Sequence, residues 1–453
     1  MSTGPLLALH LDRAQPLGLQ IERQLRALVG SPDLGLGAEL PSTRALAADL
    51  GVSRGVVVGA YAQLAAEGYI TLRRGAVPTV AALAREPEDV SVDFDVPIAA
   101  ARFNLRPDLP DLGLFPRADW LAAERAALHR AANTDLAYGE PLGARRLRRE
   151  LGPFLARTRG VLATVDRTCI AGGSSQVLHV LAATLRASGA RRVAVEDPGH
   201  RWRTRTLASS QLEIVPIALS GEPLPEVDAI VVSPDHRFPL GTSLPPDARR
   251  ALVDWAVAGD RLVVEHDYDG HFRYDRPPAG TLQALAPEHV AYVGGASALL
   301  APTLRLGWAV LPARLVEPFA NRMFAHAVAP PRLQQLALAE LIARGYLDRH
   351  LRRARATYRR RRESAIAALE RRLPDALVGG APAGLYVSVA LPRGTDEAGL
   401  LAAVRQRGIA LDGVNEHALT PQPPGLALGF AASPEPTLRR AIELLEDALT
   451  TQS

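Results

Sequence analysis

Four short runs of β-branched and apolar residues, separated by stretches of helical periodicity, dominate the middle of the chain. These runs cover residues 192–196, 229–233, 261–265 and 290–294. A run that is apolar throughout is typical of a strand buried on both faces, and a helical segment such as residues 246–257 between two such strands gives βαβ spacing. The pattern predicts an α/β domain with a mainly parallel, doubly wound sheet. After Pro331 the chain becomes helical and then ends in a smaller α+β segment.

The first 80 residues have a different organisation. Apolar residues recur with helical spacing over residues 16–28. A second helix is expected from the N-cap residue Ser42 to Gly51, which suits a left-handed C-cap, and a third helix is expected after Ser53 as N-cap. Residues 69–80 alternate like a short hairpin. Three helices, two of them joined by a tight turn, followed by a hairpin predict a winged helix-turn-helix.

A segment of different composition separates the first 80 residues from the large α/β region. Residues 81–102 contain Pro, Glu and Asp without helical or strand periodicity, which predicts a linker. The predicted organisation is a winged helix at 1–80, a linker at 81–102 and a large domain at 103–453, with a large part at about 150–330 and a small part formed by about 331–453 and 103–149.

Composition also excludes several classes of protein. With 47% hydrophobic and 22% charged residues, the 453-residue chain can bury a large core. No apolar stretch approaches the roughly 18 residues of a membrane helix, and no export signal is visible, so we expect a cytoplasmic protein without a membrane partner. The single cysteine, Cys169, excludes an intramolecular disulfide framework and a cysteine-ligated zinc site, and we expect no metal site.

The charge comes from an unusual set of side chains. The formal net charge is +4, a mild basicity that is compatible with nucleic-acid binding but does not establish it. The chain contains no lysine, so all 52 Lys and Arg residues are arginine. No side chain can therefore form a Schiff base with a carbonyl cofactor.

The N-terminal region resembles the GntR family of bacterial winged-helix regulators. The residues that carry the resemblance are Leu40-Pro41-Ser42-Thr43-Arg44, Leu50-Gly51-Val52-Ser53-Arg54, Ala60-Tyr61 and Glu67-Gly68-Tyr69. The resemblance implies binding to a double-stranded DNA operator through Arg44, Ser53, Arg54, the wing residue Arg74 and Gly75. Elementary chemistry agrees, because the N-terminus of a recognition helix favours phosphate and arginine can bond a guanine edge with two hydrogen bonds.

The large domain resembles the fold-type I aminotransferase module of the MocR subfamily of GntR regulators. The motifs are Tyr138-Gly139-Glu140-Pro141-Leu142-Gly143, Ala171-Gly172-Gly173-Ser174-Ser175-Gln176, Val195-Glu196-Asp197-Pro198-Gly199-His200, Pro234-Asp235-His236-Arg237-Phe238-Pro239 and Glu265-His266-Asp267-Tyr268-Asp269. The resemblance implies that the protein forms a homodimer and that its large domain contains a pocket related to the family's pyridoxal-phosphate site.

The resemblance also shows where this chain departs from the family. The family's cofactor lysine matches Ala298, and the aspartate expected to pair with the cofactor's ring nitrogen matches His266. The neighbouring Asp267 is expected to point to the opposite face of its strand. The aromatic residue expected to stack on the ring matches His200.

Part of the phosphate site is retained. Residues 173–176 open a predicted helix whose free N–H groups suit an anion, and the resemblance implies that Ser297 and Arg305 bind phosphate. The predicted vestigial or non-covalent ligand pocket consists of Ser174, Ser175, Gln176, His200, His266, Tyr268, Ser297, Ala298 and Arg305. We expect no catalytic residues, no covalent cofactor, and pyridoxal phosphate only as a non-covalent ligand.

The arginine run at residues 359–362 has two readings: a second nucleic-acid patch, or a solvated or dimer-forming helix face.

The sequence thus predicts a transcription regulator with an inactive aminotransferase-like domain that dimerises and has the option of binding a small anionic effector. Three alternatives stay open: a regulator that holds pyridoxal or pyridoxamine phosphate non-covalently, a constitutive DNA-binding protein whose large domain only dimerises, and a pyridoxal-phosphate aminotransferase. The last requires an amine that the chain does not provide.

Overall fold

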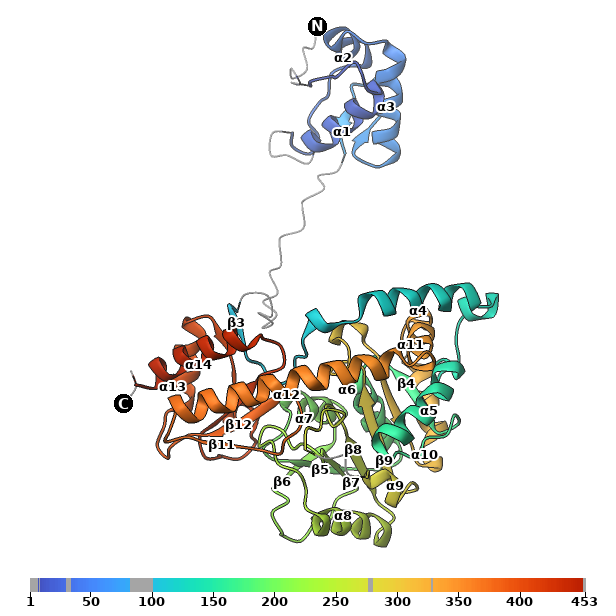
Figure 1. Cartoon of the computed structure of the whole chain (residues 1–453). Helices are drawn as coiled ribbons and strands as arrows, with labels where there is room; N and C mark the ends of the chain where they lie inside the picture. Colours follow the sequence, from blue (N-terminus) through green and yellow to red (C-terminus); the bar gives the residue numbers. More distant parts are fainter. Residues whose placement is uncertain are drawn as a thin grey trace. The chain divides into compact units, whose positions relative to one another are not determined.

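A computed structural model describes residues 7, 9–29, 34–81, 101–275, 280–326 and 329–450. The chain forms two compact units, Met1–Val96 and Pro97–Ser453, each of which is described by itself below (Figure 1). Most of the predicted linker, residues 82–100, lies outside the described residues. No helix of the described part is long and apolar enough to cross a membrane.

The first unit is a winged helix, as predicted. Its elements are α1 (Leu17–Val29), α2 (Thr43–Leu50), α3 (Arg54–Ala66) and an antiparallel pair of strands, β1 (Ile70–Thr71) and β2 (Thr79–Val80). The Ser42 hydroxyl accepts a hydrogen bond from the Ala45 amide, and Gly51 ends α2 with a φ of +62°, so both predicted caps are confirmed. Ser53 occupies the N-cap position of α3, but its side chain makes no cap hydrogen bond.

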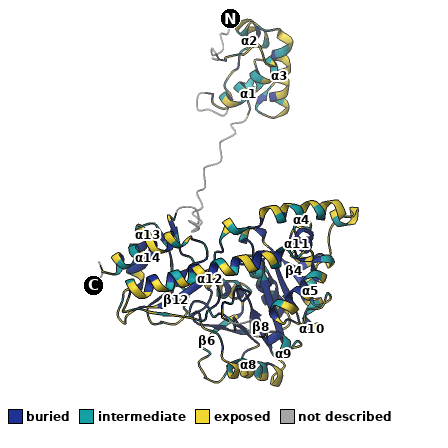
Figure 2. Cartoon of the chain, viewed as in Figure 1, coloured by how far each residue is buried: buried dark blue, intermediate teal, exposed yellow. Residues whose placement is uncertain are grey.

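The core of this unit comes from one face of each helix. Ile21 and Leu25 of α1 pack with Val57 and Leu64 of α3 in a fully buried cluster (Figure 2). The Tyr61 hydroxyl donates a hydrogen bond to the backbone carbonyl that precedes Ser42, which ties α3 to the start of α2. The core therefore fixes the orientation of α3 within the unit.

A seven-stranded sheet organises the second unit. Its order is β4 (Thr168–Ala171), β10 (Gly307–Val310), β9 (Val290–Gly295), β8 (Leu262–His266), β7 (Ala229–Val232), β5 (Arg192–Glu196) and β6 (Glu213–Ile217). Only β10 runs antiparallel to its neighbours within this sheet. The four predicted strands are confirmed as β5, β7, β8 and β9, whereas β4, β6 and β10 were not predicted.

Alternating side chains of the central strands pack against different helices. Val193, Val195 and Val231 contact the cluster that contains residues of α6 (Ser174–Ala187), α7 (Arg201–Ala208) and α10 (Ala313–Ala325). Ala194 and Ile230 belong to the cluster with α8 (Pro246–Ala258) and α9 (Leu282–Leu285). The sheet is thus buried on both faces, as a doubly wound fold requires.

The remaining helices surround one end of this sheet, and the remaining strands form a second, smaller sheet and one further pair. The helices are α4 (Arg117–Arg130), α5 (Arg145–Arg159), α11 (Arg332–Ala343), α12 (Tyr346–Arg372), α13 (Glu397–Gln406) and α14 (Glu435–Thr450). The small antiparallel sheet has the order β11 (Leu377–Gly379), β12 (Tyr386–Ala390), β15 (Gly425–Gly429) and β14 (Asp412–Gly413). The chain's re-entry strand β3 (Phe103–Asn104) pairs in parallel with β13 (Ile409–Ala410). Short 3-10 turns are η1 (Leu112–Leu114), η2 (Asn133–Leu136), η3 (Pro302–Leu304) and η4 (Asn415–His417).

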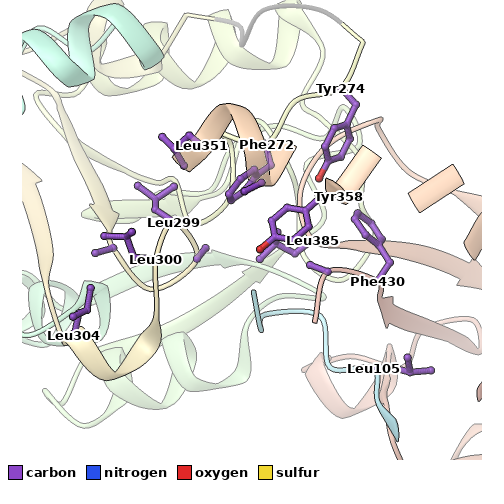
Figure 3. Close-up of a cluster of buried hydrophobic side chains, with 14 of the residues drawn as sticks. Leu105, Phe272, Tyr274, Leu299, Leu300, Leu304, Leu351, Tyr358, Leu385 and Phe430 are labelled. Carbon is purple, nitrogen blue, oxygen red and sulfur yellow. The ribbon is translucent and has the colours of Figure 1, made fainter. Parts of the chain in front are cut away.

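The long helix α12 joins the two parts of this unit (Figure 1). Its residues Leu351 and Tyr358 belong to the same buried cluster as Phe272, Leu385 and Phe430 (Figure 3). One continuous core therefore extends from the edge of the large sheet into the C-terminal part.

Part of the arginine run on α12 packs within the second unit. Arg361 is only 8% exposed and forms an ion pair of 2.8 Å with Asp111, so the expectation of a solvated face is wrong for this residue. Arg359, Arg361 and Arg362 each donate a hydrogen bond to a backbone carbonyl of a neighbouring segment. Arg361 and Arg362 thus hold α12 against the rest of the unit, whereas Arg359 and Arg360 remain exposed.

Candidate nucleic-acid interface and ligand pocket

The arginines predicted to contact DNA are exposed and unpaired. Arg44 on α2, Arg54 at the first position of α3 and Arg74 between β1 and β2 have no ion pair or hydrogen bond with the described residues. By contrast, Arg26 on α1 bonds Glu67 through two guanidinium nitrogens at 2.6–3.0 Å. A guanidinium without an internal partner is available to phosphate oxygens or base edges.

The exposed face of α3 carries few large or charged side chains. Gly55, Val58 and Gly59 are exposed there, and Arg54 is the only charged residue of the helix. Gly75 between the wing strands has a φ of +81°, and a Cβ built on it would contact nothing within 4 Å. A glycine is therefore needed at position 75 because of the backbone conformation, and not because a side chain there would clash with neighbouring atoms.

A cavity of about 370 Å³ lies where the central strands of the second unit end. The residues that line it are Asp108, Gly173, Ser174, Ser175, His200, Trp202, Thr206, His266, Tyr268, Gly295, Ser297, Ala298, Pro302, Arg305 and Leu385. Ligands of open α/β sheets bind at the carboxyl ends of the strands, and this cavity follows that rule. It brings together every predicted pocket residue except Gln176, whose side-chain oxygen instead accepts a hydrogen bond from the Gly172 amide at 2.5 Å.

One end of the cavity is built for an anion. Helix α6 begins at Ser174, and its N-cap Gly173 has no side chain that could bond the amides of the first turn. The Arg305 guanidinium lies beside this turn: a Cβ on Gly173 would be 3.7 Å from its central carbon, and one of its nitrogens is 3.4 Å from the Ser175 hydroxyl. Arg305 has no ion pair within the described residues.

Glycine residues allow the backbone segments at this end of the cavity to pack closely against each other. A Cβ on Gly307 of β10 would lie 2.4 Å from the carbonyl carbon of Gly173, so only glycine lets the strand approach the turn. Arg305 itself has a φ of +49°, a left-handed conformation that is rare for a residue with a side chain. Such strained backbone is found preferentially at functional sites.

The other end is lined by uncharged imidazoles. His266, the last residue of β8, is 1% exposed, and neither of its ring nitrogens has a hydrogen-bond partner in the described part of the chain. Burial, reinforced by the positive charge of Arg203, lowers the pKa of His266 to about 3, so the ring is neutral near pH 7. The Trp202 ring meets it edge-on at 5.6 Å.

His200 is also buried and neutral. Its ring stacks on Phe238 with 4.0 Å between the centroids, and its Nε2 has no described partner. Burial and Arg203 hold the pKa of His200 well below its ordinary value. Two buried imidazoles with unused nitrogens therefore line one cavity, and buried polar groups without partners carry a free-energy cost that a ligand can relieve.

Asp267 points away from the cavity, as strand alternation requires. It accepts hydrogen bonds from Arg159 at 2.5 Å and from the Tyr292 hydroxyl at 2.7 Å. Burial would raise the pKa of this carboxyl, but Arg159 holds it well below its usual range. Asp267 is thus a structural anion and does not take the place of a carboxylate at position 266.

Several lining residues were not predicted. Trp202 and Thr206 lie on α7, directly after His200, and helical spacing alone could have suggested them. Asp108 and Leu385 come from segments far away in the sequence, and no local pattern marks them. Long-range topology brings them to the cavity.

Fold and sites together define a class of bacterial transcription regulators. Residues 17–80 match the family model "Bacterial regulatory proteins, gntR family", and residues 109–445 match "Aminotransferase class I and II". The chain is 30% identical to the HTH-type pyridoxine biosynthesis transcriptional regulator PdxR of Corynebacterium glutamicum, over 98% of both chains. It is 29% identical to the probable rhizopine catabolism regulatory protein MocR of Rhizobium meliloti, over 98% of this chain and 96% of the relative. The chain belongs to the MocR subfamily of GntR regulators.

Solved structures similar to the second unit are aminotransferases. An archaeal alanine:glyoxylate aminotransferase matches with a TM-score of 0.72 and 22% identity, over 78% of this chain and 91% of that chain. The α-aminoadipate aminotransferase LysN of Thermus thermophilus, complexed with N-(5'-phosphopyridoxyl)-L-leucine, matches with a TM-score of 0.69 and 20% identity, over 78% and 93%. At these identities the likeness shows the fold.

The aminotransferase fold implies pyridoxal phosphate, and the residues present fit that group only in part. The Gly173 turn, Ser175 and Arg305 suit its phosphate. No lysine exists to bind its aldehyde, and the neutral His266 does not provide the carboxylate that keeps a pyridine nitrogen protonated. The covalent, ring-protonated form of the cofactor therefore does not fit this chain.

Proposed function

We propose that this protein is an operator-binding transcription regulator whose aminotransferase-like unit is catalytically inactive and acts in dimerisation and ligand sensing. The observation that carries the proposal is the combination of an exposed winged-helix surface with a transaminase fold that has no lysine. We assign Ala298 to the position of the missing lysine. A methyl group can neither form an imine nor transfer a proton.

In this proposal the DNA contacts come from the first unit. Arg54 at the start of α3 bonds a guanine edge, while Arg44, Ser53 and Arg74 position the unit on phosphates, and Gly75 lets the wing approach the minor groove. Ser53 is free for this role because its hydroxyl caps no amide of α3. The protein would act in the cytoplasm, where its operator lies.

Exposed apolar side chains of the second unit support the dimer part of the proposal. Leu121 and Leu128 on α4, Leu136 in η2 and Leu333 on α11 are between 41% and 61% exposed, and Tyr138 is fully exposed. These elements contact one another, since α11 packs against both α4 and η2. Large exposed apolar side chains gathered on adjoining elements are typical of an interaction surface. A homodimer would place two winged helices on paired half-sites.

The experiment uses an operator enriched from a random-sequence DNA library by the wild-type protein. Arg54→Ala should weaken binding to it by about 1–3 kcal/mol in gel-shift titrations, and binding should fall steeply with salt because phosphate contacts release counterions. Arg439→Ala removes the same charge from an exposed position of α14 and serves as the control. If both variants bind like the wild type, α3 is not the recognition helix.

A further inference from the structure

Two glycines lie on the exposed face of α3. Gly55 and Gly59 stand within the helix, and neither has a left-handed φ. A Cβ built on Gly59 would contact nothing within 4 Å, and a Cβ on Gly55 would lie 3.9 Å from the Ser53 hydroxyl oxygen, an ordinary contact distance. The unit therefore has room for alanine at both positions. Because glycine lowers the stability of a helix relative to alanine, these two residues weaken α3 without any benefit to packing within the unit.

Between these glycines the exposed surface of α3 is apolar. Val58 follows Arg54 by four residues, about one helical turn, and is 44% exposed. The adjacent residues Val56 and Val57 pack with the core of the unit instead. Ala62 continues the exposed face by one further turn. Val58 is thus the one branched aliphatic side chain that α3 exposes on the same face as Arg54.

Hydrogen-bonding side chains are few on this helix. Besides Arg54, only Tyr61 and Gln63 of α3 have polar side chains. The Tyr61 hydroxyl donates to the Pro41 carbonyl, and the Gln63 amide donates to Glu67 at 2.8 Å. Arg54 is therefore the only hydrogen-bonding side chain of α3 without a partner in the described part of the chain. Since base edges are read either by hydrogen bonds or by apolar contacts, the rest of α3 has mainly apolar contacts to offer.

This apolar surface suits the major-groove edge of thymine. The C5 methyl group of thymine projects into the major groove and packs against apolar side chains, whereas no other base presents a methyl group there. A valine side chain is short, so the helix backbone must approach the base closely for this contact, and the missing side chains of Gly55 and Gly59 allow that approach. Four residues of α-helix rise about 6 Å, which is close to the height of two base pairs.

We propose that Val58 is a specificity-determining residue that contacts the methyl group of a thymine in the operator, about two base pairs from the guanine bound by Arg54. Gly55 and Gly59 allow the backbone of α3 to come close enough for this contact. The inference rests on the proposed function, which makes α3 the recognition helix, and adds the base that its apolar face prefers.

The first test removes single methyl groups from the DNA. In the operator enriched by the wild-type protein, each thymine of one half-site is replaced in turn by deoxyuridine, which lacks only the C5 methyl group. Gel-shift titrations of the full chain at constant salt should find one thymine whose replacement weakens binding about fourfold, the effect of losing one methyl group from an apolar contact. In Val58→Ala the same replacement should leave the affinity unchanged. Leu19→Ala, which shortens a side chain that is 64% exposed on α1, is the control and should keep the fourfold effect.

The second test fills the space beside Val58. In Gly59→Ala, amide hydrogen exchange of residues 54–66 in the DNA-free protein should slow by about fivefold, because alanine stabilises the helix. Operator affinity should nevertheless fall by about fivefold or more, because the added methyl group overfills a close contact. Gly35→Ala is the matched control: a Cβ on Gly35 also contacts nothing within 4 Å, but this residue lies outside α3, and the variant should bind like the wild type.

Three results would overturn the proposal. The first is a wild-type protein whose affinity is unchanged by every deoxyuridine replacement, and the second is a methyl effect of equal size in the wild type and in Val58→Ala. The third is a Gly59→Ala variant with wild-type affinity, which would show that α3 does not approach the bases closely. Each of these results is compatible with weakened binding in Arg54→Ala, so a failure here is distinct from a failure of the proposed function.

Discussion

Replacing Arg159 should reveal how strongly one buried cation stabilises the segment that follows β8. Its side chain is 1% exposed, bonds Asp267 at 2.5 Å and the Gly270 carbonyl at 3.2 Å, and pairs with Asp235. In Arg159→Leu these contacts disappear, and Asp267 remains buried without a cation. Losing one partner of a buried pair typically costs 3–5 kcal/mol.

We expect about 3 kcal/mol, the low end of that range, because other donors remain. Asp267 still accepts hydrogen bonds from the Tyr292 hydroxyl at 2.7 Å and the Gly270 amide at 2.9 Å, and Asp235 still pairs with Arg249. A unit of roughly 350 residues unfolds with an entropy of about 0.75 kcal/mol/K, so its melting temperature should fall by about 4 °C.

The direction of the shift in the pKa of Asp267 determines how the stability of the wild type and of the variant changes with pH. In the wild type the pKa of Asp267 is lowered, so this carboxyl contributes stability above its ordinary pKa of about 3.9 and loses it only in more acidic solution. In Arg159→Leu burial without the guanidinium raises the pKa of Asp267. The variant should then lose stability as pH rises from 5 to 8, and its deficit relative to the wild type should be largest at pH 8.

Differential scanning calorimetry of the full chain at pH 5 and pH 8 measures both effects. Arg157→Leu is the matched control, since Arg157 lies on the same helix but forms an ion pair with Asp348 while its side chain is 55% exposed. Such a pair is worth about 0–1 kcal/mol. If the two variants melt together at pH 8, the buried cation is not what stabilises the segment after β8.

The remaining predictions concern the cofactor and the dimer. Ala298→Lys alone should gain at most a weak borohydride-reducible bond to pyridoxal phosphate, and adding His266→Asp and His200→Tyr should strengthen that bond. Visible spectra recorded before and after reduction measure it, and no gain in the triple variant would argue against the assignment of position 298. Leu128→Glu should turn a dimer into a monomer in sedimentation equilibrium, whereas Leu285→Glu, 66% exposed on α9, should not; a Leu128→Glu dimer would contradict the proposed interface.

Local patterns in the sequence were sufficient for much of the fold. Cap residues such as Ser42 and Gly51 and the apolar runs of the four central strands predict their elements because the signal lies within a few residues. Strand β6 was not predicted because it is only half-buried at a sheet edge and contains Pro216, and so lacks a continuous apolar run. β10 lies inside the sheet, but its four residues begin at Gly307 and give a short pattern.

Pocket residues that stand in the motifs carrying the family resemblance could be predicted, while those brought in by topology could not. Residues 173–175, His266 and Arg305 stand at strand ends or helix starts and meet as expected. Gln176 does not join them because its side chain bonds back to the preceding turn. Asp108 reaches the cavity through the packing of the segment at the start of the second unit, which no local pattern places there.

The most direct test of the central claim is borohydride reduction of the purified wild-type protein with excess pyridoxal phosphate, followed by peptide mass spectrometry. Because the chain has no lysine, we predict no cofactor adduct on any side chain of residues 103–453, and any reduced product should map only to the terminal α-amino group. A stoichiometric adduct within residues 103–453 would contradict the proposal that this unit is incapable of Schiff-base chemistry.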